Sequence, residues 1–191
     1  FNGTVGGNIS GTSDLAPLDQ QADMLLELLP EAQNVGILYC SAEANSVYQA
    51  DVVKAALEEK GVTVTVYTFA DSNDVATVTQ TACAENDALY IPTDNTAASC
   101  TEAINNVAEP AGVPIVAGEE GICKGCGIAT LSIDYYELGK TTGAMAAKIL
   151  TGEANVSEMP IEYYQNPVKK YDVARCEALG ITVPADYVAI G

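Results

Sequence analysis

The chain has 191 residues, and its 26 Asp and Glu residues outnumber its 8 Lys and Arg residues to leave a formal net charge of −18. This acidic balance argues against nucleic acid or an anionic membrane surface as a partner, because both attract clusters of Lys and Arg. Histidine is absent, which removes the most common general base and a frequent zinc ligand. Apolar residues make up 48% of the chain, enough to bury a core in one large domain or in one domain with an appendage.

The opening segment, residues 1–14, is rich in Gly and Asn and has no core-forming pattern. It starts without Met and resembles the interior of a longer protein, so a missing leader carries no information about location. Apolar residues then recur at helical spacing from Leu15 to Leu29, with Pro17 in the first turn. The continuous apolar run Val35–Cys40 predicts a strand that is buried on both faces.

The strand and helix patterns continue to alternate along the chain. Residues Ala44–Lys60 predict a helix ended by Gly61, and the alternating run Val62–Phe69 predicts a strand near a sheet edge. The next predicted elements are, in chain order, a helix capped by Asn73 that runs to Ala84, a strand at Ala88–Pro92, a helix at Thr96–Ala111, and strands at Val113–Ala117 and Ile128–Ile133. Asp134 and Glu137 then form a capping-box-like start for a helix that runs to Leu150.

The tail contains a short predicted strand at Ile161–Tyr164 and a helical stretch around Val173–Leu179 that is followed by Gly180. Taken together, the elements follow the order β-α-β-α-β-α-β-β-α with short connections. This order predicts an α/β fold in which helices cover both faces of a doubly wound parallel sheet.

Polar side chains follow four of the predicted strands, at the edge where an open α/β sheet gathers its ligands. We regard these as candidate ligand-binding residues: Ser41, Glu43, Asn45, Ser46, Thr93, Asp94, Asn95, Thr96, Glu119, Glu120 and Asp134. They present hydroxyl, amide and carboxylate groups, and we expect no Lys or Arg beside them. Such an edge favours a cation such as an ammonium group, while helix-start amides remain for an anionic or neutral end of the ligand.

The same residues have a plainer explanation as helix N-caps. Ser46, Asp94 and Asp134 stand at strand-to-helix junctions, where Asp and Ser commonly cap the first turn. Glu119 and Glu120 differ from them, because a Gly-Glu-Glu-Gly loop is not needed to start a helix. A functional role is therefore favoured for this acidic pair.

Sequence signatures of common enzymes are missing: there is no GxSxG elbow, no P-loop ending in GK[ST] and no HExxH. Glu119 and Glu120 could perform acid–base chemistry, but adjacent loop residues usually point apart and no nucleophile is near in sequence. The sequence therefore predicts a binding protein rather than an enzyme. The paired Tyr135 and Tyr136 could stack on a ligand, although one core ring and one surface ring is the plainer interpretation.

Among the six cysteines, only Cys123 and Cys126 have a motif spacing, and Gly125 and Gly127 place them in a predicted loop. A zinc site needs further ligands, and neither a second such pair nor a histidine is available. We therefore expect no metal and no cofactor. Inert thiols are favoured, while a local disulfide and a metal or redox function stay open; the other four cysteines are expected to be small core residues.

Four stretches of the sequence, taken in order, carry a family resemblance. They are NVGILYCSAEANS (34–46), DALYIPTDNTAAS (87–99), VPIVAGEEG (113–121) and SIDYYELGKTTGAMAAKILTGE (132–153). The chain resembles the ABC-transporter substrate-binding proteins of the tryptophan/tyrosine-binding lipoprotein group, which have the type I periplasmic-binding-protein fold. GGNISGTSDL (6–15) is similar to the family's crossover into its second lobe, and MPIEY (159–163) is similar to its return.

This resemblance implies a crossover segment at 1–14, a ligand-binding α/β lobe at 15–158 and a return segment at 159–191. Proteins of this family have two α/β lobes, and we expect the chain to carry the second lobe only, with the lobe that should precede Phe1 missing. The family's loops Ser41–Ser46, Thr93–Thr96 and Gly118–Gly121, together with Asp134, line the cleft between the lobes. Cys123 and Cys126 fall where the family is not expected to have cysteines.

The function implied by the resemblance is that of the substrate-binding component of an ABC importer. It would bind a small solute, with an amino acid, aromatic in some members, as the expected ligand and other small solutes as the alternative in some subgroups. It would dock in its closed form on a membrane permease. The location implied is extracytoplasmic, on a membrane-anchored lipoprotein at the cell surface or in the periplasm. We expect Asp94, Glu119 or Asp134 to neutralise the ammonium group of the ligand.

Two other classes of function stay open at this point. One is the ligand-sensing lobe of a transcriptional regulator, which shares the fold but needs a DNA-binding segment upstream. The other is a small flavodoxin-like enzyme that uses Glu119 or Asp94 as a base. The exposed hinge surface of a lone lobe could also pair with a second copy of the chain, giving a homodimer.

Overall fold

The computed structural model describes residues 3–190, so Phe1, Asn2 and Gly191 lie outside the described residues. The first two residues of the predicted crossover segment at 1–14 are therefore among those not described. The chain divides into two compact units. We call residues 17–132 and 168–191 the sheet unit, and residues 1–16 and 133–167 the α7 unit.

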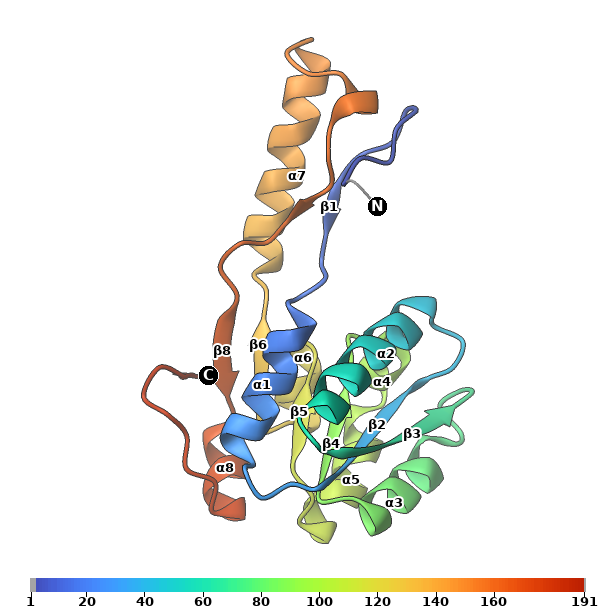
Figure 1. The fold of residues 1–191 in the computed structure, drawn as a ribbon, viewed down its shortest axis with the longest axis vertical. Coiled ribbons are helices and arrows are strands. Elements are labelled where there is room, and N and C mark those ends of the chain that lie inside the picture. The colour runs from blue at the N-terminus through green and yellow to red at the C-terminus, as the bar shows by residue number, and fades with distance from the viewer. Residues whose placement is uncertain (1–2, 191) are drawn as a thin grey trace. The chain divides into compact units, whose positions relative to one another are not determined.

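The sheet unit is built around a seven-stranded sheet in the order β3-β2-β4-β5-β6-β8-β9 (Figure 1). Its strands are β2 (Asn34–Cys40), β3 (Thr63–Phe69), β4 (Ala88–Ile91), β5 (Ile115–Ala117), β6 (Ala129–Ser132), β8 (Val168–Tyr171) and β9 (Val188–Ala189). The strands from β3 to β6 pair in parallel, whereas β8 is antiparallel to β6 and parallel to β9. Successive strands lie on both sides of β2, so the predicted doubly wound α/β sheet is confirmed.

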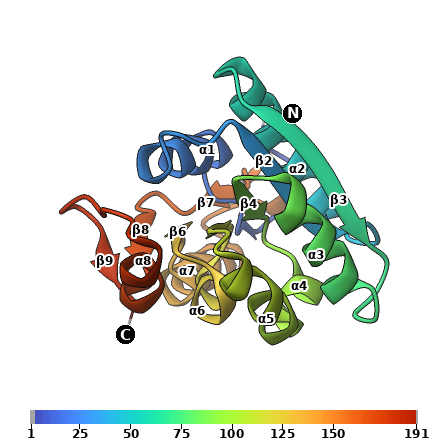
Figure 2. The same ribbon diagram turned by 90° about the horizontal axis from the view of Figure 1, so that it is seen from below.

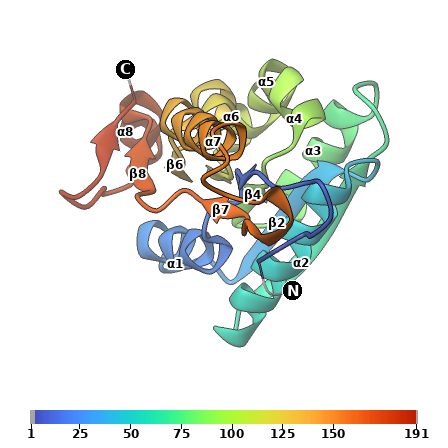
Figure 3. The same ribbon diagram turned by 90° about the horizontal axis from the view of Figure 1, so that it is seen from above.

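Helices cover both faces of this sheet, as the strand–helix alternation predicts. They are α1 (Leu18–Leu28), α2 (Ala44–Glu59), α3 (Val75–Glu85), α4 (Asn95–Ser99), α5 (Thr101–Ala111), α6 (Glu120–Cys126) and α8 (Val173–Leu179). Helices α1 and α2 pack on one face, and α3, α5 and α6 pack on the other (Figure 2). Figure 3 shows the same two layers from the opposite end of the sheet.

The burial of the strands follows from their place in the sheet order. Strand β2 is buried at every residue except Asn34, and β4, β5 and β6 are buried throughout, as expected for strands covered on both faces. Strand β3 alternates between buried and exposed residues because it lies at the edge. Between the sheet and helices α3, α5 and α6 lies a core that includes Phe69, Ile91, Ile104 and Ile122.

Two helix predictions are wrong in detail: one predicted helix is divided in two, and another has a different residue before its first turn. The single helix expected at Thr96–Ala111 is two helices, α4 and α5, because the chain tightens where the Cys100 amide donates to the Ala97 carbonyl at 2.9 Å. Asn73 does not cap α3. The residue before that helix is Asp74, and the Asn73 amide instead donates to the Asp71 carboxylate at 2.8 Å.

The loop predicted from Gly118 through the cysteine pair is wrong, because this stretch forms helix α6. The carboxylate of Glu119 accepts hydrogen bonds from the amides of Gly121 (2.6 Å) and Ile122 (2.5 Å), and it thereby caps the helix. Glutamate is an uncommon N-cap compared with Asp, Asn, Ser or Thr, which is why its presence did not indicate a helix start. Cys123 and Cys126 are consequently helical residues.

The end of the chain returns to the sheet. Helix α8 has the predicted bounds, and Gly180 follows it with a left-handed φ of 68°, as a C-terminal glycine should. Strands β8 and β9 were not expected. The sequence of β8, Val-Lys-Lys-Tyr, has too little apolar character to indicate a strand, and its place is set by antiparallel pairing with β6.

The α7 unit contains a parallel pair of two-residue strands, β1 (Thr12–Ser13) and β7 (Glu162–Tyr163), together with α7 (Tyr135–Leu150) and the short 3-10 helix η1 (Val156–Glu158). The predicted helix start is confirmed, because the Asp134 carboxylate accepts from the amides of Tyr136 (2.9 Å) and Glu137 (3.1 Å). The Glu137 carboxylate pairs with Lys140. A small apolar cluster of Ala16, Ile133, Leu138 and Tyr164 packs this unit.

Candidate functional site

Three of the predicted segments meet at the carboxyl ends of β2, β4 and β5, which are neighbours in the sheet. The Asn45 amide, after β2, donates to the Thr93 carbonyl at 2.8 Å. The Thr93 hydroxyl, after β4, lies 3.4 Å from the Gly118 carbonyl that follows β5. We call this group of segments, 41–46, 93–96 and 118–120, the carboxyl edge. The strand-end argument thus brings together the predicted residues of the sheet unit.

Glu43 fastens two of these segments to each other. Its carboxylate accepts from the backbone amide and side-chain amide of Asn95 (2.9 and 3.0 Å) and from the backbone amide and hydroxyl of Thr96 (2.8 and 2.7 Å). Burial acts to raise the pKa of the Glu43 carboxyl, but these four hydrogen bonds outweigh it, and the net pKa is lowered. The ionised carboxylate therefore holds the first turn of α4 against the segment that follows β2.

Asp94 has the role of an N-cap, one of the two roles that its position allows. The side chain is only 1% exposed, with one oxygen 2.7 Å from the Ala97 amide and the other 2.8 Å from the Cys40 amide. The first bond caps α4 and the second ties the end of β2 to it. A carboxylate so deeply buried is a structural link between two strand ends.

The backbone amide and carbonyl of Thr93 both bond to a residue that was not predicted as a site residue. Gln49, in α2, accepts from the Thr93 amide at 3.1 Å and donates to the Thr93 carbonyl at 3.3 Å. The Ser46 hydroxyl adds a longer bond of 3.4 Å to the same carbonyl. A buried Gln on an amphipathic helix gives no sequence signal of this kind, because its partner is a backbone group far along the chain.

A second buried glutamine lies beneath Gly118. The side-chain amide of Gln21, in α1, donates to the carbonyls of Gly118 (3.1 Å) and Leu131 (3.2 Å). The Tyr90 hydroxyl, in β4, donates to the Gln21 carbonyl oxygen at 2.5 Å, and burial raises the pKa of Tyr90 so that this proton is retained. Neither side chain was predicted as a site residue.

The two glutamates that follow β5, Glu119 and Glu120, have different roles. Glu119 caps α6 and is half-buried, whereas Glu120 forms ion pairs with Lys124 (3.0 Å) and Lys170 (2.5 Å). Hydrogen bonding from Lys170 is the main cause that lowers the pKa of Glu120. The expectation that no lysine lies beside these acids is therefore wrong. Lys170 belongs to β8, a strand that the sequence did not indicate.

Asp134 belongs to the α7 unit, where it is exposed and caps α7. The two hydrogen bonds that it accepts both go to Oδ1. The next two residues, Tyr135 and Tyr136, are 50% and 75% exposed. The expectation of one core ring and one surface ring is therefore wrong, since both rings reach the surface.

The side chains of the carboxyl edge that remain accessible are neutral or acidic. Ser41, Asn45 and Asn95 are exposed, and Thr93, Thr96 and Glu119 are half-buried. Their backbone is fixed by the buried side chains described above, so hydroxyl, amide and carboxylate groups are presented on a rigid support. Such an arrangement can recognise a small polar molecule by hydrogen bonds without performing covalent chemistry.

Comparison with known proteins decides the family. Residues 3–189 match the family described as ABC transporter substrate binding protein. The chain belongs to this family. A tyrosine-binding protein of Clostridioides difficile is 32% identical over 156 residues, which cover 82% of this chain and 45% of that protein. The resemblance found in the sequence is thereby confirmed.

Solved structures agree with this assignment. A Streptococcus pneumonia ABC domain in complex with L-Trp is 30% identical with a TM-score of 0.89, covering 97% of this chain and 62% of that one. A ligand-free, open substrate-binding protein with adhesive properties from Clostridium difficile is 31% identical with a TM-score of 0.79, covering 100% and 66%. The chain therefore spans less than half of the curated relative and about two thirds of these structures. The relatives are solute-binding proteins, so the enzyme alternative is set aside.

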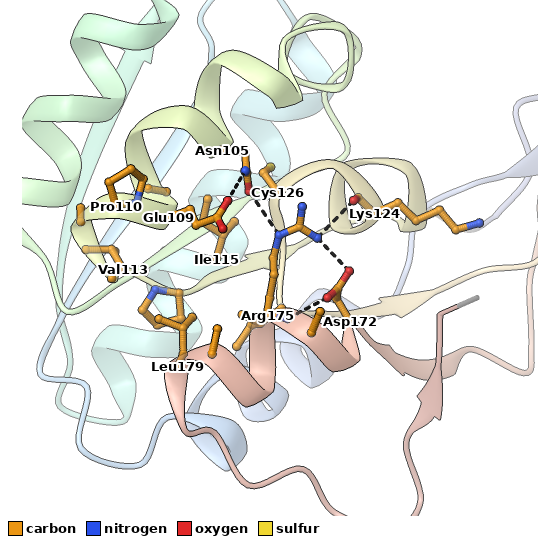
Figure 4. Close-up of a pocket in the computed structure, with 17 residues that line it drawn as sticks. Asn105, Glu109, Pro110, Val113, Ile115, Lys124, Cys126, Asp172, Arg175 and Leu179 are labelled. Carbon is orange, nitrogen blue, oxygen red and sulfur yellow. Dashed lines mark hydrogen bonds and ion pairs between the residues drawn. The ribbon is translucent and has the colours of Figure 1, made fainter.

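In this substrate-binding family member, one cavity of the sheet unit lies away from the carboxyl edge. It has a volume of about 610 Å³ between the C-terminal part of α5, the start of β5, α6 and α8, and none of the predicted site residues lines it (Figure 4). Arg175 stands at its centre and bonds to Asp172 (2.8 Å), Asn105 (3.2 Å) and the Gly125 carbonyl (2.9 Å). These polar groups are therefore paired with one another or with backbone carbonyls, and the Arg175–Asp172 ion pair is partly exposed.

Burial makes the thiols of Cys123, Cys126 and Cys176 poor nucleophiles. Each of the six cysteines, all of which lie among the described residues, is a free thiol, so the disulfide alternative is wrong. Burial is the main cause that raises the pKa of Cys126 to about 12 and of Cys176 to about 11, and it raises that of Cys123 further. Protonated thiols are poor nucleophiles and poor metal ligands. Within residues 3–190 no group of three or more Cys, Asp or Glu side chains is arranged to hold a metal ion.

Proposed function

We propose that this substrate-binding protein recognises an amino acid, with an aromatic one preferred, at the carboxyl edge of the sheet unit. The observation that carries the proposal is the set of accessible hydroxyl, amide and carboxylate groups that three neighbouring strand ends present on a rigid backbone. The L-Trp and tyrosine named for the relatives support the aromatic class.

The ligand ammonium group is assigned to Glu119 or Asp134, both named as candidates from the sequence. Each oxygen of Glu119 accepts one backbone hydrogen bond and the side chain remains half-buried, which leaves lone pairs that a ligand can reach. Asp134 is exposed, and its cap uses one oxygen. Asp94 is assigned a structural role instead, because it is buried between two backbone amides.

The ligand would lie in a cleft between this lobe and a second lobe, and the closed protein would deliver it to an ABC permease in the membrane. We further propose an extracytoplasmic location and a lipid anchor, in keeping with the lipoprotein group that the sequence resembles. No helix among residues 3–190 is long and apolar enough to cross a bilayer. A homodimer of this chain on its own is a separate proposal, which sedimentation of the 191-residue chain tests.

The experiment is calorimetric titration of the full-length gene product with L-Tyr, L-Trp, L-Phe and the des-amino analogue of tyrosine. We expect tight binding of at least one aromatic amino acid and much weaker binding of the analogue. Replacing the residue that holds the ammonium, by Glu119→Gln or Asp134→Asn, should weaken amino-acid binding about tenfold or more, the size of one charge-assisted hydrogen bond. The same variant should bind the des-amino analogue as the unchanged protein does.

Glu109→Gln is the matched control. It removes an exposed carboxylate at the opposite edge of the same sheet, beside the Arg175 cavity, and should leave every affinity within twofold. Amino-acid binding that survives both the Glu119 and Asp134 substitutions would contradict the ammonium assignment. Failure to bind any amino acid would contradict the ligand class and leave family membership untouched.

A further inference from the structure

The side chains of Gln21 and Tyr90 form a buried pair beneath the carboxyl edge. Both are 0% exposed, and the Tyr90 hydroxyl is 2.5 Å from the Gln21 carbonyl oxygen. An amide in such a site must find partners for its N–H groups, since a buried donor left without an acceptor is destabilising. Tyr90 fixes which end of the amide faces β4, and the N–H end is therefore turned toward β5 and β6.

Both N–H bonds of Gln21 go to backbone carbonyls at strand ends. One acceptor is Gly118, the first residue after β5, at 3.1 Å, and the other is Leu131, near the end of β6, at 3.2 Å. A single side chain of α1 thus fixes the distance between two neighbouring strand ends at the edge where the site lies.

Gly118 is fitted closely against its surroundings. Its amide donates to the Ile91 carbonyl at 2.7 Å, and a Cβ atom on it would lie 2.6 Å from the Thr93 amide nitrogen. Gly118 thus lies directly against the backbone of Thr93, and its carbonyl is 3.4 Å from the Thr93 hydroxyl. A displacement of the Gly118 carbonyl would therefore reach both Thr93 and Glu119, the next residue in the chain.

Gln21 and Leu131 lie near the two points where the chain enters and leaves the sheet unit. Helix α1 starts at Leu18, just after the chain enters the sheet unit at residue 17, so Gln21 lies in its first turn. Leu131 stands just before the chain leaves that unit after Ser132. From this first turn, the Gln21 side chain therefore joins the residue before the exit of the chain to the start of the Glu119 segment.

We propose that Gln21, oriented by Tyr90, is a positioning residue for the ligand-binding Gly118–Glu119 segment, and that ligand affinity depends on its two bonds to backbone carbonyls. This inference rests on the proposed function, since it concerns the same site. Gln21 acts through Gly118 rather than by touching the ligand. A merely structural role would lower stability without moving the segment or changing the affinity.

The variants that test this are Gln21→Met, which keeps length and removes the amide, and Tyr90→Phe, which removes one hydroxyl. Tyr67→Phe is the matched control. Its hydroxyl bonds to Glu85 (2.6 Å) and Asn86 (2.9 Å), away from the carboxyl edge, so it removes a comparable network elsewhere in the same sheet. The double variant Gln21→Met with Tyr90→Phe shows whether Tyr90 acts through Gln21.

Hydrogen exchange of the ligand-free full-length protein gives the first measurement, because the amides of Gly121 and Ile122 bond to Glu119 and report the state of its cap. Relative to amides of β2, we expect their exchange to speed up about tenfold in Gln21→Met and about threefold in Tyr90→Phe. The Kd for the aromatic amino acid should rise by similar factors. The double variant should match Gln21→Met alone, and Tyr67→Phe should change neither measurement.

Unchanged exchange at Gly121 and Ile122 in folded Gln21→Met would overturn the proposal, and so would faster exchange with a Kd that stays within twofold. If Gln21→Met does not fold, Tyr90→Phe decides by the same two criteria. A full-length protein that binds no amino acid contradicts the proposed function. The exchange measurement still decides whether Gln21 positions the segment.

Discussion

Different kinds of side chain hold the two ends of the strands in the seven-stranded sheet. At the carboxyl edge, the uncharged side chains of Gln21 and Gln49 and the carboxylates of Glu43 and Asp94 bond mainly to backbone groups, and small polar side chains remain accessible. At the opposite edge, the single guanidinium of Arg175 bonds to its neighbours around a cavity of about 610 Å³. The cavity at this edge is thus lined by polar groups that are already paired.

Under the proposed function, this contrast means that the volume of the Arg175 cavity alone does not indicate the ligand site. Recognition of a polar solute needs donors and acceptors that are held in place but still have bonding capacity. The carboxyl edge meets that condition, because separate buried side chains hold its backbone. The Arg175 cavity does not meet it, because the guanidinium of Arg175 already bonds to Asp172, Asn105 and the Gly125 carbonyl.

The largest effect that tests the contrast is expected from Asp94→Ala. It removes a 1% exposed carboxylate and leaves the amides of Cys40 and Ala97 without their acceptor. We expect the free energy of unfolding to fall by about 2–4 kcal/mol, from one lost helix cap and one lost charge-assisted bond. Urea denaturation measures it.

The matched control for this change is Asp74→Ala. Asp74 precedes α3, and its side chain makes no cap hydrogen bond among the described residues. Its loss should shift the free energy of unfolding by no more than about 0.5 kcal/mol. Equal losses for the two variants would show that the strand-end links at the carboxyl edge add nothing to stability.

Arg175→Lys tests the other edge. Lysine keeps the charge but cannot reach Asp172, Asn105 and the Gly125 carbonyl at once, because it lacks the planar fork of arginine. We expect a loss of about 1–3 kcal/mol in the free energy of unfolding with no change in the Kd for the amino acid. A weakened Kd at unchanged stability would place ligand recognition at the cavity instead.

Glu43→Gln gives the smallest effect and adds a pH dependence. At neutral pH the variant should lose about 1 kcal/mol, since an amide oxygen cannot replace both carboxylate oxygens toward Asn95 and Thr96. The folded-state pKa of Glu43 is lowered, so its ionised form stabilises the fold above its unfolded pKa of about 4.3, and this contribution is lost as pH falls through the folded pKa.

The difference between wild type and Glu43→Gln should therefore be full at pH 7 and shrink in acid. Urea denaturation at several pH values between about 7 and 3 measures it, with Glu59→Gln as a control for an exposed carboxylate. A difference that stays constant across this range would mean that hydrogen bonding to ionised Glu43 does not hold α4.

Much of the architecture was predictable because short-range patterns decide it. The run Val35–Cys40 became the buried strand β2, the alternating Val62–Phe69 became the edge strand β3, and Val173–Leu179 became α8. The errors fell where a partner far along the chain decides or where a cap is of an uncommon type. Strand β8 exists because β6 offers it an edge, and α6 starts at an uncommon glutamate cap.

The candidate site shows the same division. Polar residues after parallel strands were predictable from the chain itself, because parallel strands place their carboxyl ends at one edge. The role of each side chain was not: Asp94 became a buried link, Glu120 met Lys170 of β8, and Gln21 and Gln49 gave no signal. Their partners are backbone groups or residues separated by long stretches of chain.

The sequence by itself determined the doubly wound class, the family and the sheet edge where polar groups gather, because periodicity, strand–helix alternation and local motifs are properties of neighbouring residues. Only the tertiary structure decided which of those groups support the backbone and which stay accessible. Hydrogen-bond partners are chosen by proximity in space. The burial that makes a bond such as Tyr90 to Gln21 obligatory exists only once the sheet and its helices are packed.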